Sequence, residues 1–329
     1  MSKQVHVTLT GGLGNQFFQL SAGLSMIDGV NETVVLDSGL GRPRLSSDGL
    51  PELASFSFSE KVLFKKNQRN SWFYRKTNGY LLRMGVRLKW YEKPQILRTF
   101  LKKLGRFVLT RYFKEKVDVF TGEGLGYFDL PISDKSVNLS GYFQSYKYFE
   151  LGSAKEVLSK ISLKSSSEEL EHLINLCRLE RPLIVHFRLG DYEQEELFGI
   201  PGDDYYRKAL DCAITETQLS NIWFFSDDIE KAKTRFPSTS KLNVPVRWIN
   251  SVEDSTAKTF ELMRHGAAYV LANSSFSYWA ALISHTKDAK VWAPWPWFQK
   301  MDSPNLLIPP SWETINPWTP TQKQERRIL

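Results

Sequence analysis

Short apolar runs alternate with polar and amphipathic stretches along most of the chain. In the second half they occupy residues 182–187, 221–226, 246–249, 267–271 and 289–292. Near the N-terminus, residues 5–9 and 33–36 form two more runs. Runs of this length predict buried strands, and their alternation with helical segments is typical of parallel sheets. The pattern therefore predicts an α/β protein.

Helical segments are predicted between these runs, at residues 155–177, 229–235 and 276–284 and after a glycine turn whose Asn15 can cap the helix. A chain of 329 residues is long enough for two domains. We expect an N-terminal domain of residues 1–155 and a C-terminal domain of residues 156–329. The proline-rich, polar tail from Ser303 is expected to pack as a surface extension or to stay loose.

A cationic motif follows the run at 182–187. His186, Arg188 and Gly190 stand at the predicted carboxyl end of a strand, where open α/β sheets bind ligands. Arg188 cannot lose its charge, and its planar donors match two phosphate oxygens at once. Asp191 can hold the turn or the arginine. The alternative is an ordinary strand-to-loop transition with a surface salt bridge.

Two strand-to-helix turns carry small polar or glycine residues. Gly11, Gly12 and Gly14 let backbone N–H groups approach a ligand, and a helix N-terminus favours an anion. The run lacks the full dinucleotide spacing, so a tight βα turn is the alternative. Asn273, Ser274 and Ser275 precede a predicted helix in the same way, and the alternative there is a plain N-cap. Asp227 and Asp228 end another strand, where they bind a base or ribose or cap the next helix.

Five segments together resemble a known family. They are GGLGNQFFQ at 11–19, GYFQSYKYF at 141–149, HFRLGD at 186–191, FSDD at 225–228 and ANSSFSYWAA at 272–281. Their order and spacing resemble those of the bacterial α-1,2-fucosyltransferases of glycosyltransferase family 11, over residues 8–298. Many members carry a second arginine where Leu189 stands, so the role of that charge is not carried over.

The resemblance implies a fold and an activity. It implies an α/β fold of the GT-B type, with two Rossmann-like domains facing a cleft. It also implies an inverting, metal-independent transfer of L-fucose from GDP-β-L-fucose to the 2-hydroxyl of a galactose. The acceptor would be a galactose-containing oligosaccharide of a surface polysaccharide, such as O-antigen or capsule. Residues 1–155 would form the acceptor side and residues 156–329 would bind GDP-fucose.

The residues implied to bind the donor come from both predicted domains. They are His186, Arg188, Asp227, Ser274, Ser275, Phe276, Gly12, Gly14, Asn15 and Gln16. Arg188 would grip the diphosphate and neutralise charge on the departing GDP. Two rival hypotheses stay open: a fucosyltransferase of another linkage or acceptor, such as one similar to protein O-fucosyltransferases, or a non-enzymatic nucleotide-sugar binder.

No metal or cofactor is predicted. The five histidines are scattered along the sequence, and Cys177 and Cys212 lack the spacing of a metal motif. An arginine and helix N-termini can supply the electrostatic stabilisation instead. Inversion needs a proton acceptor near the acceptor hydroxyl, and the candidates are Asp37, Asp191 and Glu193. A phosphate oxygen of the donor is the alternative.

Charge is unevenly distributed over the chain. The formal net charge is +7, yet residues 61–116 hold 17 Lys or Arg against the acids Glu92 and Glu115 alone. Aromatic residues are interleaved with these charges, so we expect a basic aromatic insertion in the N-terminal domain. It can be a solvated face, an anionic-membrane surface or a nucleic-acid surface. The family resemblance favours the membrane, and we predict no nucleic acid partner.

Composition and the N-terminus bear on location. The chain is 42% apolar and 24% charged, without a run of 18 apolar residues or the apolar core of a signal peptide. We therefore expect a cytoplasmic protein with reduced thiols. Peripheral docking on the inner face of the cytoplasmic membrane is an additional hypothesis.

Overall fold

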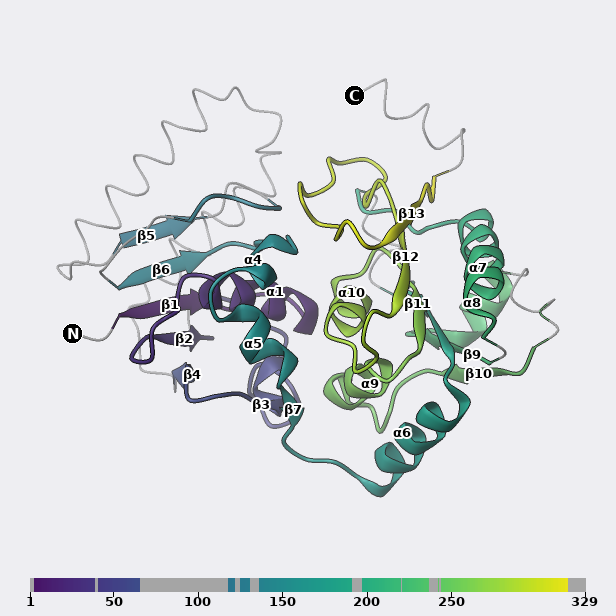
Figure 1. The fold of residues 1–329 in the computed structure, drawn as a ribbon, viewed down its shortest axis with the longest axis horizontal. Coiled ribbons are helices and arrows are strands. Elements are labelled where there is room, and N and C mark those ends of the chain that lie inside the picture. The colour runs from purple at the N-terminus through teal and green to yellow at the C-terminus, as the bar shows by residue number, and fades with distance from the viewer. Residues whose placement is uncertain are drawn as a thin grey trace. The chain divides into compact units, whose positions relative to one another are not determined.

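The computed structural model describes residues 3–38, 41–65, 118–121, 125–130, 136–190, 197–219, 221–236, 242 and 244–318. They form two compact units, each treated by itself (Figure 1). Unit 1 comprises Met1–Ser162 and Pro304–Leu307, and unit 2 comprises Leu163–Ser303 and Ile308–Leu329. The domain boundary predicted after residue 155 stays a prediction. Most of the basic segment 61–116 lies outside the described residues, as do Asp191 and Glu193.

Unit 1 is built on a five-stranded parallel sheet in the order β4-β2-β1-β6-β5. Its strands are β1 (Gln4–Thr8), β2 (Thr33–Asp37), β4 (Val62–Lys65), β5 (Asp118–Thr121) and β6 (Val137–Ser140). The helix α1 (Leu13–Leu24) connects β1 to β2 and packs on both. A Cβ on Gly23 would lie 2.6 Å from Cγ2 of Val7. A glycine at this position therefore lets the helix lie close to the central strand.

The other elements of unit 1 are η1 (Glu52–Ser55), β3 (Phe56–Ser57), α4 (Lys147–Glu150) and α5 (Ala154–Ser159). Both α4 and α5 pack on α1. A return segment, Pro304–Leu307, completes the unit. The Tyr127 N–H donates to Oδ1 of Asn305 over 2.9 Å, and the Ser145 hydroxyl donates to the Leu306 carbonyl over 2.6 Å.

The helical segment predicted at 155–177 is interrupted. The helix α5 ends at Ser159, β7 (Ser162–Leu163) pairs with β3, and α6 begins only at Glu168 and runs to Glu180. Three serines precede α6, and their side chains compete with helical hydrogen bonds. The last of them, Ser167, accepts the Leu170 N–H and so starts the new helix.

Unit 2 holds a six-stranded parallel sheet in the order β10-β9-β8-β11-β12-β13. Its strands are β8 (Leu183–Phe187), β9 (Ile222–Ser226), β10 (Val246–Ile249), β11 (Ala268–Val270), β12 (Lys290–Pro294) and β13 (Glu313–Ile315). The first five match the predicted runs. The sixth shows that part of the C-terminal tail joins the sheet.

Helices cover both faces of this sheet. They are α6, α7 (Asp203–Thr217), α8 (Ile229–Arg235), α9 (Thr256–Met263) and α10 (Ser275–Leu282). Figure 1 shows α7 and α8 on one face and α9 and α10 on the other. On the α7 side, the Phe187 ring stacks on Phe236 at 4.5 Å and contacts Tyr206 at 4.5 Å. The parallel sheet and helices of each unit confirm the predicted α/β fold class with two Rossmann-like domains, while a cleft between the domains stays a prediction.

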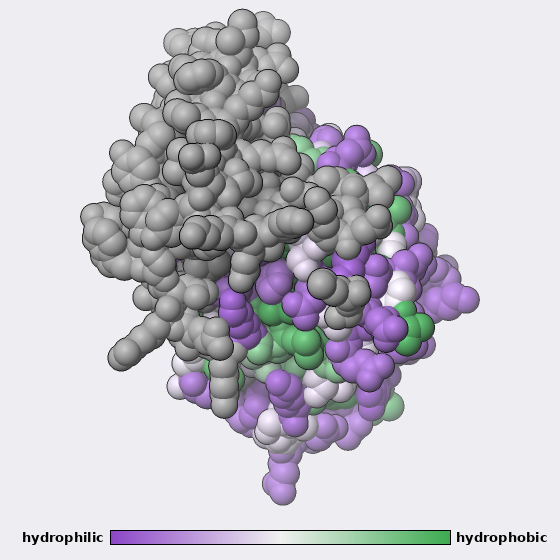
Figure 2. Space-filling model, turned by 90° about the vertical axis from the view of Figure 1, so that its left-hand side faces the viewer, coloured by the Kyte–Doolittle hydropathy of each residue, from purple (hydrophilic) through white to green (hydrophobic). Residues whose placement is uncertain are grey.

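The surface of unit 1 is largely hydrophilic where its described residues can be seen. Figure 2 shows hydrophilic side chains around a small hydrophobic area on this face. Leu63, on the edge strand β4, keeps 44% of its surface exposed. None of the helices in the described ranges has both the length and the apolar character needed to cross a bilayer.

Candidate functional site

Asp227 organises the loop that follows β8. Ser226 ends β9 and lies opposite Phe187 in the register, so Asp227 follows the strand beside β8. Its Oδ1 accepts the Leu189 N–H over 2.9 Å, and its Oδ2 accepts the Gly190 N–H over 3.0 Å. The same Oδ2 lies 3.3 Å from Nη1 of Arg188. The Asp227 carboxylate therefore holds two backbone N–H groups of the loop after β8 and the Arg188 side chain.

Gly190 leaves the room that this contact needs. A Cβ at this position would lie 2.6 Å from Oδ2 of Asp227. A side chain here would therefore push the carboxylate away from the loop. The structure gives Asp227 this positioning role, and its predicted contact with a guanine or ribose stays a prediction.

His186 ends β8 as a buried, neutral imidazole. The residue is 5% exposed, and its ring centroid lies 6.0 Å from that of Phe276, while its carbonyl accepts the Tyr206 hydroxyl over 3.1 Å. Burial, aided by the charge of Arg188, lowers the pKa of His186 to about 3. Among the described residues, no group hydrogen-bonds its Nδ1. A buried imidazole nitrogen in this state can pair with a polar ligand atom.

The turn before α10 lies at the same edge of the sheet. Ser274 is the N-cap, and its hydroxyl oxygen accepts the Phe276 N–H over 3.4 Å, so the N-cap interpretation holds. Asn273 is fully buried and donates through Nδ2 to the Phe198 and Gly199 carbonyls at 3.2 and 3.0 Å. The carboxyl ends of β8, β9 and β11 thus bring together His186, Arg188, Asp227, Ser274, Ser275 and Phe276, an arrangement suited to an anion.

Asp228, the second carboxylate of the pair, has a different role. Its side chain is the N-cap of α8 and accepts the Lys231 N–H over 3.0 Å. Asp227 points to the β8 loop and Asp228 to its own helix. The two carboxylates are therefore held by different partners.

The glycine turn of unit 1 differs from its prediction. Gly12 is the N-cap of α1, and Asn15 lies inside the first turn of the helix, so Asn15 as the cap was wrong. Gly12 has no side chain that could cap the helix. Instead, Oε2 of Glu52 accepts the Leu13 N–H over 2.7 Å. The Asn15 Oδ1 accepts Nε2 of Gln144 over 2.9 Å. Sequence reasoning missed Glu52, because no local pattern links it to a helix 39 residues away.

Gln16 is held entirely by backbone groups. It is fully buried, and its Nε2 donates to the Gly11 and Arg44 carbonyls at 3.0 and 3.1 Å. Its Oε1 accepts the Leu53 N–H over 2.9 Å. The side chain thus ties the turn to Arg44 and to η1. Its predicted contact with the donor, like those of Gly12, Gly14 and Asn15, stays a prediction.

The general base is not assigned by the described residues. Asp37 ends β2, is 7% exposed and lies 3.7 Å from Nζ of Lys65. Its role as a base stays a prediction, and the same holds for Asp191, which lies outside the described residues.

Two of the histidines that are scattered along the sequence meet in the fold. His265 and His285 lie with Glu261 so closely that one ligand atom from each lies within 4.8 Å of the others. His285 is 20 or more positions from His265 and Glu261, so no sequence spacing reveals that it joins them. The group precedes β11 and β12 and so lies at the amino ends of these strands, whereas Arg188 follows the carboxyl end of β8.

The class of protein follows from a family comparison: a model of glycosyltransferase family 11 matches residues 48–307, which is more than half of the chain. The chain belongs to glycosyltransferase family 11. An α-1,2-colitosyltransferase of Escherichia coli is 29% identical over 174 residues, which make up 50% of this chain and 57% of that protein. The match thus spans little more than half of that relative.

Two other similar proteins are matched over most of their length. The O-antigen biosynthesis glycosyltransferase WbnK of Escherichia coli is 25% identical over 317 residues, 91% of this chain and 97% of that protein. The NodZ α-1,6-fucosyltransferase of Bradyrhizobium, solved after soaking with GDP-fucose, is 15% identical with a TM-score of 0.44. That comparison covers 86% of this chain and 93% of the other.

The buried state of His186 predicts a pH dependence of stability. In the folded chain the pKa of His186, about 3, lies below the ordinary 6.5. The contribution of His186 to the free energy of unfolding is therefore fully present above pH 6.5 and is lost as the pH falls towards 3. Between pH 7 and pH 5 this group should lower the free energy of unfolding by about 2 kcal/mol. Urea unfolding at both pH values measures the loss.

The variant His186→Asn should lose less stability than the wild type over the same interval. His172→Asn, which changes an exposed histidine on α6, is the matched control and should behave as the wild type does. Equal losses in wild type and His186→Asn would show that His186 does not titrate in this way.

Proposed function

We propose that the protein transfers L-fucose from GDP-β-L-fucose to the 2-hydroxyl of a galactose, with inversion, in the assembly of a surface polysaccharide such as O-antigen. The observation that carries the proposal is Arg188, held by Asp227 at the carboxyl edge of the unit 2 sheet. Membership of family 11 supports it. One relative's name gives an α-1,2 linkage and the other's gives O-antigen biosynthesis.

The chemistry places negative charge where this site is positive. As the bond between the sugar and the diphosphate breaks, charge grows on the departing GDP. Arg188 and the backbone N–H groups at the start of α10 stabilise that charge. The neutral His186 contributes a hydrogen bond without repelling Arg188. The acceptor hydroxyl attacks the opposite face of the sugar, and its proton passes to Asp37, Asp191 or a phosphate oxygen.

A second donor has a specific observation in its favour. The relative at 29% identity is named as a colitosyltransferase. Colitose is L-fucose without its 3-hydroxyl, so a site that binds the diphosphate and the rest of the sugar could accept both. A GDP-linked colitose donor is therefore the second candidate.

The test is a transfer assay with the purified chain. GDP-fucose and GDP-colitose are each incubated with a panel of galactose-terminated oligosaccharides, and NMR of the product gives linkage and anomeric configuration. An α-1,2 product is expected, and a 2-deoxygalactose acceptor should give none. A product of another linkage, or GDP-fucose left intact with every acceptor, would overturn the proposal.

Transfer is expected to continue in excess EDTA. Both oxygens of Asp227 are engaged by backbone N–H groups and Arg188, and Asp228 caps α8, so this pair is poorly placed to hold a divalent ion. Product formation with and without chelator measures the effect. Loss of transfer on chelation, restored by Mn²⁺ or Mg²⁺, would return the two carboxylates to consideration as ligands.

A further inference from the structure

Four side-chain amides lie at the carboxyl edge of the unit 1 sheet. Asn15, Gln16 and Gln19 belong to α1, which follows β1, and Gln144 lies in the turn after β6. The strands β2 and β4 lie on one side of β1, and β6 and β5 lie on the other, so the strand order reverses between β1 and β6. Open parallel sheets bind ligands at the carboxyl ends of the strands where their order reverses. The amides are therefore in a position suited to a ligand.

Two of these amides are used fully by backbone groups. Both ends of Gln16 are bonded, as described above. Gln19 accepts the Thr10 N–H at Oε1 over 2.9 Å, and its Nε2 donates to the Thr10 and Gly141 carbonyls over 3.3 and 3.1 Å. These bonds hold the turns after β1 and β6 together. The fold thus accounts for the amide groups of both side chains.

Asn15 and Gln144 bond to each other and leave one end of each amide open. Nε2 of Gln144 donates to Oδ1 of Asn15 over 2.9 Å. Oε1 of Gln144 is buried without a hydrogen-bond partner among the described residues, and none of these accepts from Nδ2 of Asn15. Turning both amides over would keep their mutual bond and still leave an end of each open. A buried oxygen without a partner destabilises the fold, so stability does not explain Gln144.

The turn that carries Gln144 has a strained backbone. Phe143 has a φ of 51°, in the left-handed region that bulky residues rarely adopt. The Ser145 N–H donates to the Phe143 carbonyl over 2.8 Å, so Gln144 stands at the centre of a three-residue turn. Strain of this kind persists where the surroundings enforce it, and it is typical of ligand-binding sites.

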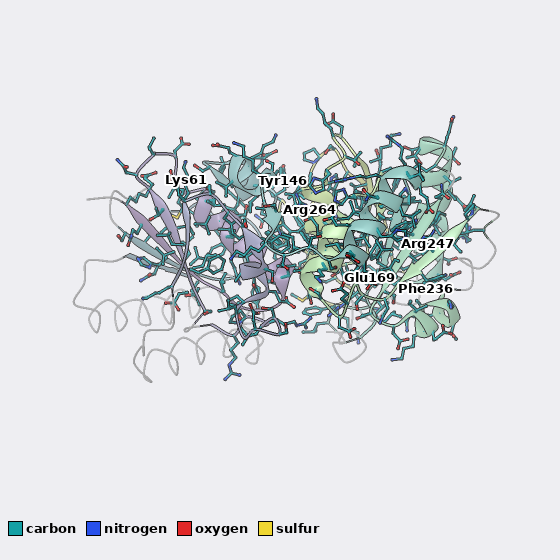
Figure 3. The ribbon with its side chains drawn as sticks, turned by 90° about the horizontal axis from the view of Figure 1, so that it is seen from below. Lys61, Tyr146, Glu169, Phe236, Arg247 and Arg264 are labelled. Atoms are coloured by element: carbon teal, nitrogen blue, oxygen red, sulfur yellow. The ribbon has the colours of Figure 1, made fainter. Side chains whose placement is uncertain are left out.

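The surroundings hold this turn on both sides. The side chain of Phe143 is fully buried. The Ser145 hydroxyl and the N–H of Tyr146, which Figure 3 labels, both donate to the Leu306 carbonyl, over 2.6 and 3.1 Å. Gln144 is therefore fixed by its neighbours along the chain and can in turn fix the side chain that it bonds.

We propose that Gln144 is a positioning residue that turns the amide of Asn15 so that its open end meets a hydroxyl of the fucosyl ring. This role rests on the proposed function and adds a residue that the family resemblance does not supply. A sugar hydroxyl both donates and accepts, so it can pair with either end of an amide. Asn15 is partly exposed and can touch a ligand, whereas Gln144 is only 9% exposed.

The test compares Gln144→Met with the wild type in the transfer assay. Methionine is about as long as glutamine but cannot donate to the Asn15 amide. We expect the KM for GDP-fucose to rise about three- to tenfold, the size of one neutral hydrogen bond, with little change in kcat. Inhibition by GDP, which lacks the sugar, should stay as in the wild type. Urea unfolding should show equal or greater stability, because the variant no longer buries an unpaired oxygen.

A double-mutant cycle shows whether Gln144 acts through Asn15. Once Asn15→Ala has removed the contact with the sugar, Gln144→Met should have no further effect on the KM. Gln4→Met, at the amino end of β1, is the matched control and should leave the KM unchanged.

Three results would overturn the role of Gln144 alone: a wild-type KM in Gln144→Met, an equal rise of the KM with and without Asn15, or a parallel weakening of GDP inhibition. Lower stability with an unchanged KM would make Gln144 a structural residue only. A wild type that transfers no fucose would instead overturn the proposed function, and this role with it.

Discussion

Replacement of Arg188 by lysine is expected to lower the rate of fucosyl transfer by about 10²–10³, close to the effect of Arg188→Ala. Arginine presents a planar fork that can contact two phosphate oxygens, and Asp227 orients that fork from 3.3 Å. Lysine keeps the charge but offers a single point donor. Initial rates at saturating GDP-fucose, with unfolding curves for each variant, measure the change.

Arg207→Lys is the matched control for this substitution. Arg207 lies on α7 and pairs with Asp204 one turn away at 3.2 Å, on the exposed surface. Its replacement should leave transfer unchanged. If Arg188→Lys keeps more than about a tenth of the wild-type rate, far from the 10²–10³ loss typical of such a donor, Arg188 does not bind the diphosphate as proposed.

Replacement of Asp227 by alanine is expected to have the second largest effect, a loss of transfer of at least about tenfold, because one such misplaced group costs about 1.4 kcal/mol or more. The change frees the Leu189 and Gly190 N–H groups and leaves Arg188 without its orienting carboxylate. Transfer rate and circular dichroism, measured together, separate a loss of geometry from a loss of folding.

The neighbouring carboxylate gives the contrast. Asp228→Ala removes the cap of α8 and should cost about 1 kcal/mol of stability, with transfer as in the wild type. Should the two variants lose transfer equally, the different partners of Asp227 and Asp228 would have no bearing on the reaction.

Local rules predicted the parts of the fold that local forces decide. The first five strands of unit 2 lie where the apolar runs predicted them, and the strands inside the sheet do so because a strand buried on both faces needs a continuous apolar sequence. Ser274 and Asp228 are N-caps, as one of the two interpretations of each had it. Strand β13 escaped prediction because Glu313–Ile315 is short and mostly exposed, and it is a strand only through its pairing with β12.

The parts that failed depend on distant partners. Asn15 has the right chemistry for a cap, but α1 starts earlier because Glu52 accepts the Leu13 N–H. The bonds from Asp227 to the β8 loop join residues 37 and 38 positions apart. His265 and His285 are likewise close only in the folded chain. Residue types were readable from the sequence, whereas these partnerships required the topology.

The short return of residues 304–307 to unit 1 has a consequence for dissecting the protein. A fragment ending at Ser162 would lack Asn305 and Leu306, so the Tyr127 N–H, the Ser145 hydroxyl and the Tyr146 N–H would each lose an acceptor. A fragment beginning at Leu163 would carry those acceptors without their donors. No single cut therefore yields two complete pieces, and unit 1 made alone needs the four residues joined to its own end through a linker.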